Sequence, residues 1–299
     1  MKDNSLSIII PAFNEAQTIG GLVVKIRTLH PDSEIIVIND GSSDNTAEVA
    51  EKVGAKVFSH PYNIGNGAAV KTGIKKSSGE VLVFMDGDNQ HDPEDISKLI
   101  AFLPKYDMAV GARSMNGHAS WGRALGNKAY NWMATYVAKF PIKDLTSGFR
   151  AIKSHIAFDF LNLLPNTYSY PTTITLGVLR NGGSVRYVPI AFRKREAGQS
   201  NISLLKDGVR FFMIITRICT LYSPMRVFLP VSGVMFLLGL ANYIYTFTTQ
   251  GRFTNMSALL FVTSILIFMM SLISEQVCQM RFERHSSDRH FHNSDQPPS

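Results

Sequence analysis

Short apolar runs alternate with amphipathic stretches through the first 85 residues of the chain. The apolar runs are 6–11, 34–39, 56–59 and 80–85, and the stretches with helical periodicity are 16–29, 46–53 and 67–76. Strands that alternate with helices are typical of βαβ units in a mostly parallel sheet. The apolar runs lack polar alternation, which indicates strands buried on both faces. The pattern therefore predicts an α/β fold, a mostly parallel sheet flanked by helices.

Polar clusters follow three of these predicted strands. They occupy residues 11–15, 39–44 and 86–90. Ligands of open α/β sheets bind beyond the carboxyl ends of the strands. We therefore expect the three clusters to meet at one edge of the sheet and to form the functional site.

The cluster after the fourth strand contains Asp86-Gly87-Asp88. Two carboxylates that flank a glycine at a strand end are able to share one divalent cation, and Gln90 offers a further carbonyl oxygen. Hard oxygen ligands suit Mg²⁺ or Mn²⁺ and leave positions open for diphosphate oxygens. The alternative is an ordinary Asp-Gly turn, but its place after a buried strand and beside two other polar clusters favours the metal site.

The other clusters have simpler interpretations. Asp44 precedes the helix predicted near Thr46, so we expect it to cap that helix. Asp40 lies where a carboxylate accepts hydrogen bonds from a base or a ribose. Residues 65–67, Gly-Asn-Gly, predict a tight helix entry rather than a nucleotide-binding glycine loop, because Val70 stands where a third glycine would be needed.

Two long uncharged runs, 227–249 and 253–274, lie near the C-terminus. They contain 23 and 22 residues, and roughly 20 helical residues cross a bilayer core of about 30 Å. Two such runs in tandem are rare in soluble domains, so we expect a transmembrane hairpin. Arginines flank its outer ends and only Arg252 lies in the turn, which places both ends in the cytoplasm. The apolar run at 6–10 is too short for a signal peptide.

These patterns divide the chain into four parts. Residues 1–202 are expected to form a cytosolic catalytic domain, 227–280 to hold the two spans and 281–299 to be a disordered cytosolic tail. Residues 203–226 carry a basic stripe that includes Lys206, Arg210 and Arg217, which indicates an interfacial helix facing lipid phosphates. An ordinary amphipathic core helix is the alternative for that segment.

Composition narrows the class of function. The chain has 299 residues, a mean hydropathy of +0.04 and a net charge of +7, and its two cysteines exclude a disulfide framework or a cysteine-rich zinc site. The charge fits anionic lipid or a phosphorylated substrate better than nucleic acid, since no basic-aromatic platform is present. Scattered histidines and the lack of a G-x-S-x-G motif exclude zinc hydrolysis and acyl transfer.

Four motifs, taken in order, resemble those of the GT-A glycosyltransferases of family 2. They are 11–15, 39–42, 86–91 and 145–150, and the resemblance extends from residue 6 to about residue 201. Within the family the chain is similar to the branch of dolichol-phosphate mannose synthases and polyprenyl-phosphate glycosyltransferases, and the two C-terminal spans resemble those of bacterial members. The resemblance implies a GT-A fold and a metal-dependent, inverting transfer of a sugar. The implied donor is a nucleoside diphosphate sugar, GDP-mannose or a UDP-hexose, and the implied acceptor is a polyprenyl phosphate in the cytoplasmic membrane.

The resemblance also implies roles for individual residues. The base and the ribose of the donor would be held by Pro11, Phe13, Glu15, Ile38 and Asp40. Asp86 and Gly87 would contact the donor, and the cation would be held by Asp86, Asp88 and Gln90. Arg113 and Arg123 would bind phosphate groups, Ser147 would lie near the acceptor phosphate, and Arg195 and Asn201 would belong to a loop that closes over the donor.

Three positions depart from the family pattern. Phe13 stands where Tyr is usual, which keeps ring stacking and loses a hydroxyl, and Asn39 replaces the first Asp of the DDGS motif. Asn201 replaces the usual Lys, so one cation near the diphosphate is lost unless Lys194 compensates. These departures bear on the identity of the donor and on loop closure rather than on the fold.

The implied acceptor needs little chemical activation by the protein. A lipid phosphate is already ionised near pH 7, so it attacks without a strong general base while the protein positions groups and neutralises charge. No general base is assigned, because Asp88 is expected to be occupied by the metal. Two alternatives stay open, a membrane-bound family 2 enzyme acting on a saccharide acceptor and a non-catalytic scaffold that binds a nucleotide sugar. The sequence also leaves open the particular sugar and whether the chain forms a homo-oligomer.

Overall fold

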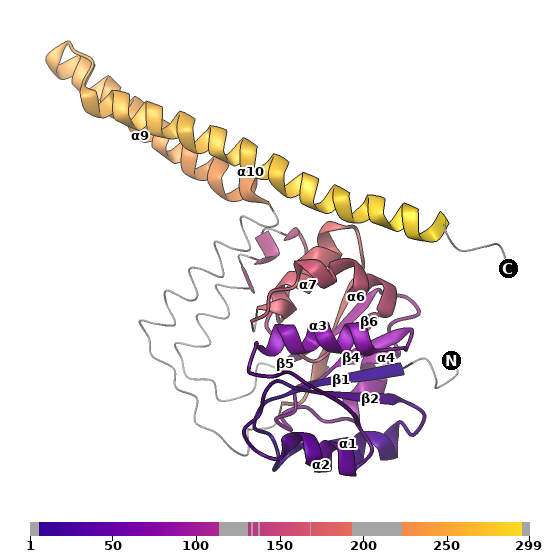
Figure 1. Cartoon of the computed structure of the whole chain (residues 1–299). Coiled ribbons are helices and arrows are strands. Elements are labelled where there is room, and N and C mark those ends of the chain that lie inside the picture. Colours follow the sequence, from indigo (N-terminus) through magenta and orange to yellow (C-terminus); the bar gives the residue numbers. More distant parts are fainter. Residues whose placement is uncertain are drawn as a thin grey trace. The chain divides into compact units, whose positions relative to one another are not determined.

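The computed structural model of the chain describes residues 6–113, 131–132, 134–136, 138–167, 169–192 and 223–294, without the side chains of 113 and 281–294. It contains two compact units, Met1–Leu204 and Leu205–Ser299, and each is described by itself (Figure 1). The interfacial helix expected within 203–226 falls almost entirely outside the described residues.

The first unit is an α/β structure, as the pattern predicts. Its described elements follow one another as β1 (Leu6–Ala12), α1 (Ile19–Leu29), β2 (Glu34–Asn39), α2 (Thr46–Lys52), β3 (Lys56–Ser59), α3 (Asn66–Lys76), β4 (Val81–Phe84), α4 (Asp95–Ile100), β5 (Met108–Arg113), β6 (Arg150–Lys153), α6 (Ser154–Phe160), the 3₁₀ turn η2 (Leu161–Leu163), α7 (Tyr170–Arg180) and β7 (Val185–Ile190). The described strands form one sheet in the order β3-β2-β1-β4-β6-β5-β7, in which β6 is antiparallel to both neighbours and the other pairs are parallel.

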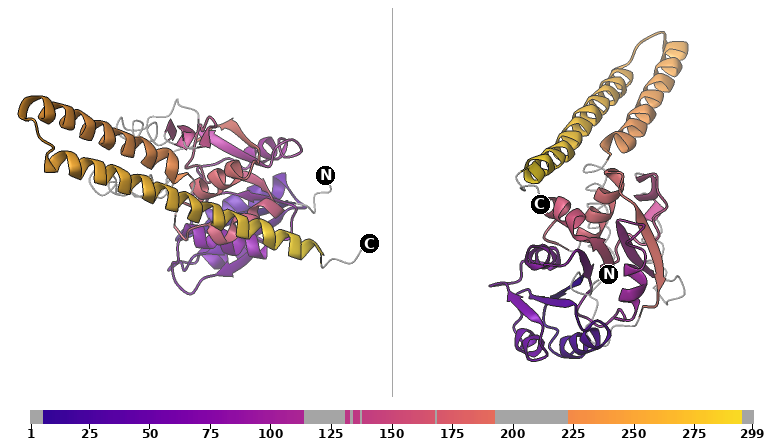
Figure 2. Two further views of the ribbon diagram at one scale, coloured as in Figure 1. Left: turned by 90° about the horizontal axis from the view of Figure 1, so that it is seen from above. Right: turned by 90° about the vertical axis from the view of Figure 1, so that its right-hand side faces the viewer.

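The continuous apolar runs are explained by burial on both faces of this sheet. In β1, Ile8 and Ile10 join the core shared with α1 and α4, whereas Ile9 faces α3, and all three side chains are fully buried. Each such side chain contributes about 1.5–3 kcal/mol on burial. Figures 1 and 2 show the two helical layers, with α1 and α2 on one face of the sheet and α3 and α6 on the other.

Helix α1 begins three residues later than its periodicity predicts. The carbonyl oxygen of Glu15 accepts hydrogen bonds from the N–H groups of Thr18 (3.0 Å) and Ile19 (2.9 Å), so residues 15–18 form a turn before the helix. Asn14 takes a left-handed conformation with a φ of 55°. This turn keeps the polar residues after β1 at the edge of the sheet.

The Gly-Asn-Gly sequence at the start of α3 is explained by a contact with a segment about a hundred residues further along the chain. The segment 165–167 runs directly against the start of α3, and the N–H of Ala68 donates to the carbonyl of Asn166 at 3.2 Å. A Cβ on Gly67 would lie 2.7 Å from the carbonyl oxygen of Thr167 and closer still to that of Pro165, and Gly65 is held at a φ of +121°. Glycine is required at both positions because two backbones touch there.

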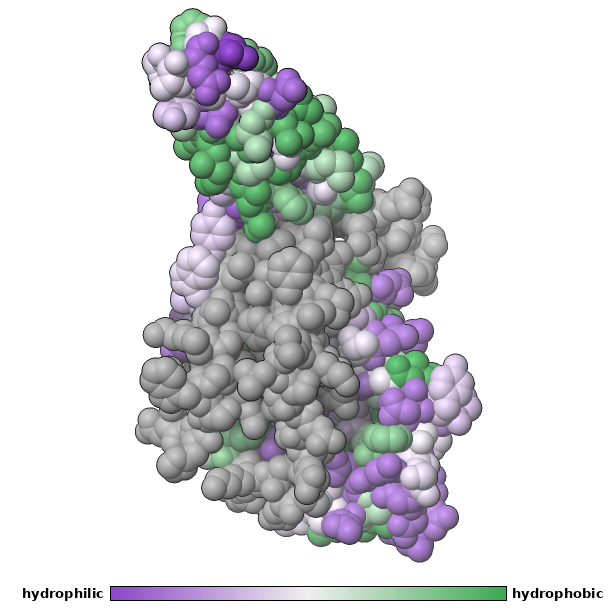
Figure 3. All heavy atoms as spheres, turned by 90° about the vertical axis from the view of Figure 1, so that its left-hand side faces the viewer, coloured by the Kyte–Doolittle hydropathy of each residue, from purple (hydrophilic) through white to green (hydrophobic). Residues whose placement is uncertain are grey.

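The second unit is a hairpin of α9 (Pro224–Gln250) and α10 (Asn255–Ser294), joined by a turn with Gly251 in the left-handed conformation. Both helices are long and apolar enough to cross a membrane, with hydropathies of 1.9 for Pro224–Gln250 and 2.4 for Asn255–Met280. Figure 3 shows a largely hydrophobic surface over the hairpin. Helix α10 continues to Ser294, so the disordered tail expected from residue 281 is helical for most of its length.

The two hairpin helices meet along a seam of small residues repeated every seven positions. On α9 these are Ser232, Gly239 and Thr246, and on α10 they are Ser257, Ser264 and Ser271, all of them buried. The Ser232 hydroxyl donates to the carbonyl of Ser264 (2.9 Å), and the Ser264 hydroxyl donates to the carbonyl of Ser232 (3.0 Å). A seven-residue repeat is typical of left-handed packing, and small polar residues let membrane helices approach closely.

We predict that Gly67→Ala destabilises the first unit by about 1–3 kcal/mol, because the new methyl group must displace the 165–167 backbone. The matched control is Gly21→Ala on α1, where an added Cβ meets nothing within 4 Å and higher helix propensity favours the variant. Thermal unfolding of the full-length protein in detergent checks both. Equal midpoints for the two variants would show that the close approach does not exist.

We also predict that Ser232→Ala and Ser264→Ala are coupled. Either change leaves one carbonyl without its hydroxyl donor and also removes the 3.2 Å contact between the two hydroxyls. Because this shared contact is lost only once, the double variant should cost less than the sum of the single ones, by about 0.6–1.7 kcal/mol. A double-mutant cycle measured by denaturation in mixed micelles gives the coupling. Ser257→Ala paired with Ser232→Ala serves as the uncoupled control, and a coupling of zero for the main pair would contradict the serine contact.

Candidate active site

Three loops at the carboxyl edge of the sheet are joined by hydrogen bonds, as expected from the polar clusters. The N–H of Asn14 donates to the Ser42 hydroxyl, and the N–H of Ser43 donates to the Asn14 side-chain oxygen, both at 2.9 Å. The Thr18 hydroxyl donates to the carbonyl of Gly87 at 2.9 Å. The loops after β1, β2 and β4 therefore form one connected surface.

The 145–150 motif joins the same edge because β6 is antiparallel to β4. Arg150, the first residue of β6, pairs with Phe84, the last residue of β4. This register places Gly148 directly against the carboxylate of Asp86, where a Cβ on the glycine would lie 2.7 Å from Oδ2. Only glycine fits this approach without displacing the carboxylate.

The pair Asp86 and Asp88 is partly buried within this edge. The Asn66 side-chain nitrogen donates to Oδ1 of Asp86 at 3.4 Å, and the N–H of Gln90 donates to Oδ1 of Asp88 at 3.2 Å. Asn89, between Asp88 and Gln90, has a φ of 58°, which turns the chain back over Asp88.

A divalent cation fits the oxygen groups around Asp86. Two carboxylates and the amide oxygen of Gln90 are the hard ligands that Mg²⁺ and Mn²⁺ take. Oδ1 of Asn66 is buried and has no hydrogen-bond partner in the described part of the chain. Within the same residues no three His, Cys, Asp or Glu side chains gather around one point.

Asp40 is 3% exposed and is surrounded by hydrogen-bond donors. Its carboxylate accepts from the N–H groups of Ile64 (3.0 Å) and Gly65 (2.8 Å), and it lies 2.7 Å from Nδ1 of His60. Nε2 of His60 contacts the Thr72 hydroxyl at 2.9 Å. Asp40 thus fixes the loop that leads into α3, a role that no local sequence signal indicates.

Asp44 contacts the helix start, but it also braces the first loop. Helix α2 begins at Thr46 after Asn45 in the cap position, and Asp44 accepts from the N–H and the hydroxyl of Thr46 and from the N–H of Ala16. Burial raises the pKa of the Asp44 carboxyl, but these hydrogen bonds outweigh it and bring the pKa below its usual range.

Arg150 is a fully buried cation, and spacing alone does not reveal its role. Its guanidinium donates to the carbonyls of Ser147 and Pro171 and to the Thr175 hydroxyl. Burial lowers the pKa of Arg150, while Tyr170, Tyr187, Asp144 and Asp86 act in the opposite direction. The arginine therefore ties the 145–150 turn to α7 and holds that turn beside Asp86.

The remaining predicted residues occupy different surroundings. Pro11 and Ile38 pair in register on β1 and β2, and the Ile38 side chain packs in the core with Ala69. Phe13 is 44% exposed at the edge, which leaves its ring accessible. Arg113 ends β5 at the same edge of the sheet, paired with Ile190. Arg123, Arg195 and Asn201 lie outside the described residues, as does Lys194.

Ser147 is 4% exposed, and its hydroxyl oxygen has no hydrogen-bond partner among the described residues. Its N–H donates to Oδ1 of Asp144 at 3.2 Å. The backbone is thus fixed while the hydroxyl keeps its capacity to donate to a ligand.

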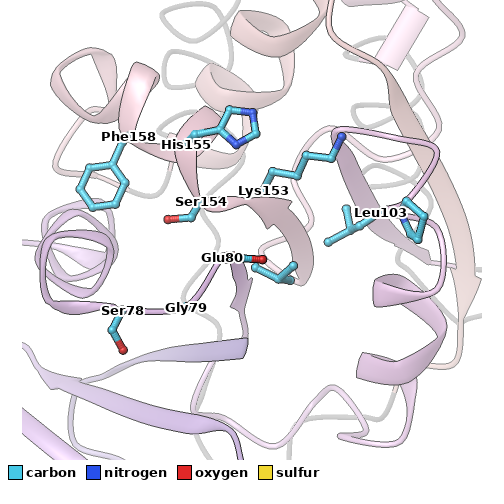
Figure 4. Close-up of a pocket in the computed structure, with 10 residues that line it drawn as sticks. Ser78, Gly79, Glu80, Leu103, Lys153, Ser154, His155 and Phe158 are labelled. Atoms are coloured by element: carbon cyan, nitrogen blue, oxygen red, sulfur yellow. The ribbon is translucent and has the colours of Figure 1, made fainter. Parts of the chain in front are cut away.

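An open hollow of about 660 Å³ lies at the opposite edge of the sheet (Figure 4). Its lining comes from the start of β4 and the segment before it, from the segment after α4, from the end of β6 and from α6, and includes Ser78, Glu80, Lys153 and His155. None of the predicted site residues lines it. The motifs and the loop contacts therefore place the candidate active site at the carboxyl edge instead.

Comparison with known proteins identifies two segments. Residues 7–159 match glycosyl transferase family 2, and residues 223–280 match the GtrB C-terminal hairpin. A polyprenol monophosphomannose synthase of Mycolicibacterium smegmatis is 30% identical over 66% of this chain and 80% of its own length. An undecaprenyl-phosphate 4-deoxy-4-formamido-L-arabinose transferase of Proteus mirabilis is 27% identical over 80% of this chain and 74% of its own length.

A solved structure shows the same fold. The glucosyl-3-phosphoglycerate synthase of Mycobacterium tuberculosis, in complex with Mn²⁺, UDP-glucose and phosphoglyceric acid, superposes with a TM-score of 0.59 at 20% identity. The match covers 72% of this chain and 79% of that protein.

We predict that Gly148→Ala weakens Mn²⁺ binding by about 10-fold or more, because the added methyl group displaces Oδ2 of Asp86 from its place. Gly21→Ala again serves as the control. Isothermal titration of the full-length protein with Mn²⁺ measures the effect, and an unchanged affinity for Gly148→Ala would remove Asp86 from the cation site.

Proposed function

Because this chain belongs to glycosyl transferase family 2, we propose that it transfers a sugar, with inversion, from a nucleoside diphosphate sugar to a polyprenyl phosphate at the membrane. The observation that carries the proposal is the convergence of the 13–15, 40–45 and 86–90 loops at one sheet edge, in a chain whose second unit is a membrane-length apolar hairpin. Two relatives act, by their names, on polyprenol or undecaprenyl phosphate.

The donor side of the proposed site is formed by the loops after β1 and β2. We propose that the exposed ring of Phe13 stacks on the base and that Glu15 lines the base and ribose pocket. Pro11, Ile38 and Asp40 are buried, so they are proposed to support this pocket from within, Asp40 by fixing the loop before α3. GDP-mannose and UDP-hexoses are the donors that we propose. Arg195 and Asn201, which lie outside the described residues, are proposed to contact the diphosphate.

The leaving group is handled by the 86–90 turn. Asp86, Asp88 and Gln90 would hold Mg²⁺ or Mn²⁺, and Gly87 would let the backbone lie close to the donor. When bound, the cation neutralises charge on the departing diphosphate. Asn66 and Gly148 keep the Asp86 carboxylate in one orientation while the bond to the anomeric carbon breaks.

The acceptor side is formed by Ser147 and the arginines. The Ser147 hydroxyl, unpartnered within the described residues, donates to an oxygen of the lipid phosphate. Arg113 and Arg123 neutralise the two anionic reactants, which otherwise repel each other. An ionised phosphate oxygen attacks the anomeric carbon opposite the leaving group, so no general base is needed.

The hairpin gives the chain its place at the membrane. Both termini and the first unit are proposed to lie in the cytosol. Arginines are more numerous at the outer ends of the two spans than in the turn, which contains only Arg252, and positive charge favours the cytoplasmic side. The 203–226 segment is proposed to lie in the headgroup layer, where the acceptor phosphate is found. A homo-oligomer is compatible with this arrangement and is not required by it.

The test is a transfer assay with full-length protein in detergent, Mn²⁺ or Mg²⁺, undecaprenyl phosphate and a panel of labelled nucleotide sugars. We expect label from one donor to enter the organic phase and to be lost with EDTA. Asp88→Ala should lower the rate at least about 100-fold, since several kcal/mol of charge stabilisation are lost. Asp32→Ala, in the exposed turn between α1 and β2, is the matched control and should leave the rate unchanged.

Other outcomes would overturn the proposal in different ways. Label on a soluble saccharide would indicate another acceptor class. Metal-dependent nucleotide binding without transfer to any acceptor would favour a scaffold. Full activity of Asp88→Ala would reject the metal assignment.

A further inference from the structure

We propose that Asn66 is a positioning residue for the cation site, fixing the Asp86 carboxylate and accepting a hydrogen bond from a water ligand of the bound cation. The inference rests on the proposed function, because it concerns the cation that Asp86 and Asp88 hold. The glycines on either side of Asn66 explain the helix entry, but they assign no task to the asparagine itself.

The backbone of Asn66 is held from two directions. The preceding N–H, that of Gly65, donates to Oδ2 of Asp40 at 2.8 Å. The segment 165–167 presses against Gly65 and Gly67 from another side and bonds to the N–H of Ala68. The first residue of α3 is therefore fixed relative to the sheet edge, as a positioning residue must be.

The side chain of Asn66 does not serve the helix that it begins. Gly65 occupies the N-cap position of α3, and no side-chain hydrogen bond caps this helix. The Asn66 amide instead points across to another loop and donates to Oδ1 of Asp86 at 3.4 Å. A capping role thus leaves the contact with Asp86 unexplained.

The orientation of the amide follows from the chemistry of its partner. A carboxylate only accepts hydrogen bonds, so the nitrogen of the amide must face Asp86 and the oxygen must face away. That oxygen, Oδ1, is buried without a partner among the described residues. A buried acceptor left unpaired is unfavourable, so the site is one donor short.

A water ligand of the cation supplies this donor. Mg²⁺ and Mn²⁺ held by one or two carboxylates keep several waters, and such waters are polarised donors that seek an acceptor. With its nitrogen on Asp86 and its oxygen on a water ligand, Asn66 spans the ligand shell from the side of α3. Outer groups of this kind typically change metal affinity by about 10–100-fold.

The test compares Asn66→Ala, Asn66→Asp and Asn63→Ala in full-length protein in detergent. Asn63 is an exposed residue of the same loop and is the matched control. The dissociation constant for Mn²⁺ comes from the electron paramagnetic resonance signal of the free ion, and water-proton relaxation reports on waters of the bound ion. Thermal midpoints without Mn²⁺ are measured on the same samples.

We expect Asn66→Ala to weaken Mn²⁺ binding about 10–100-fold and to change the water-proton relaxation of the bound ion, with an unchanged thermal midpoint. Asn66→Asp keeps an oxygen for the water ligand but loses the donor to Asp86, so it should bind Mn²⁺ more tightly than Asn66→Ala. Asn63→Ala should match the wild type in every measurement.

Three results would overturn the inference. Wild-type affinity in Asn66→Ala would show that the residue does not act on the cation, while leaving the proposed function intact. Loss of binding together with a lowered thermal midpoint, or equal losses in Asn66→Ala and Asn66→Asp, would indicate a purely structural role. Lack of Mn²⁺ binding by the wild type would reject the metal part of the proposed function itself.

Discussion

Close contact between backbones at the carboxyl edge of the sheet is the constraint on which the rest of the site depends. Gly41, with a φ of +73°, leaves no room for a side chain against Tyr62, and Gly65 and Gly67 leave none against the 165–167 segment. Gly148 stands in the same relation to the Asp86 carboxylate. Because glycine leaves room for these approaches, segments from distant parts of the chain share one small surface.

Buried polar groups then fix what the close contacts bring together. Asp40 gathers the loop before α3, Asp44 joins the first two loops, and Arg150 ties the 145–150 turn to α7. Each of these charged side chains bonds largely to backbone N–H or C=O groups. Such groups are present in any sequence that forms the same turns. The side-chain oxygens of Asn66 and Ser147 have no partner among the described residues, and they are the groups for which we propose ligand contacts.

Sequence patterns located the elements better than the contacts between them. The strand at 34–39 was predictable because burial on both sheet faces leaves a continuous apolar run. The strand at 56–59, which is partly exposed, and the helix ending at Lys76 also lie where their patterns predict them. The roles of His60, Asn66 and Arg150 could not be predicted from the sequence. Their hydrogen-bond partners lie 3 to 25 residues away along the chain, at separations that follow no regular pattern. Helix α10 also runs past residue 280, where charge and polarity suggested a disordered tail.

The seven-residue seam of the hairpin restricts how its length is able to change over evolution. One inserted residue turns the rest of a helix by about 100°, which would carry Ser232 or Ser264 from the seam to the lipid-facing side. Seven inserted residues amount to nearly two full turns and restore the register. Natural variants of this hairpin should therefore differ in length by whole heptads within the spans, or by changes confined to the turn near Gly251. Insertions of single residues within the spans should be disfavoured.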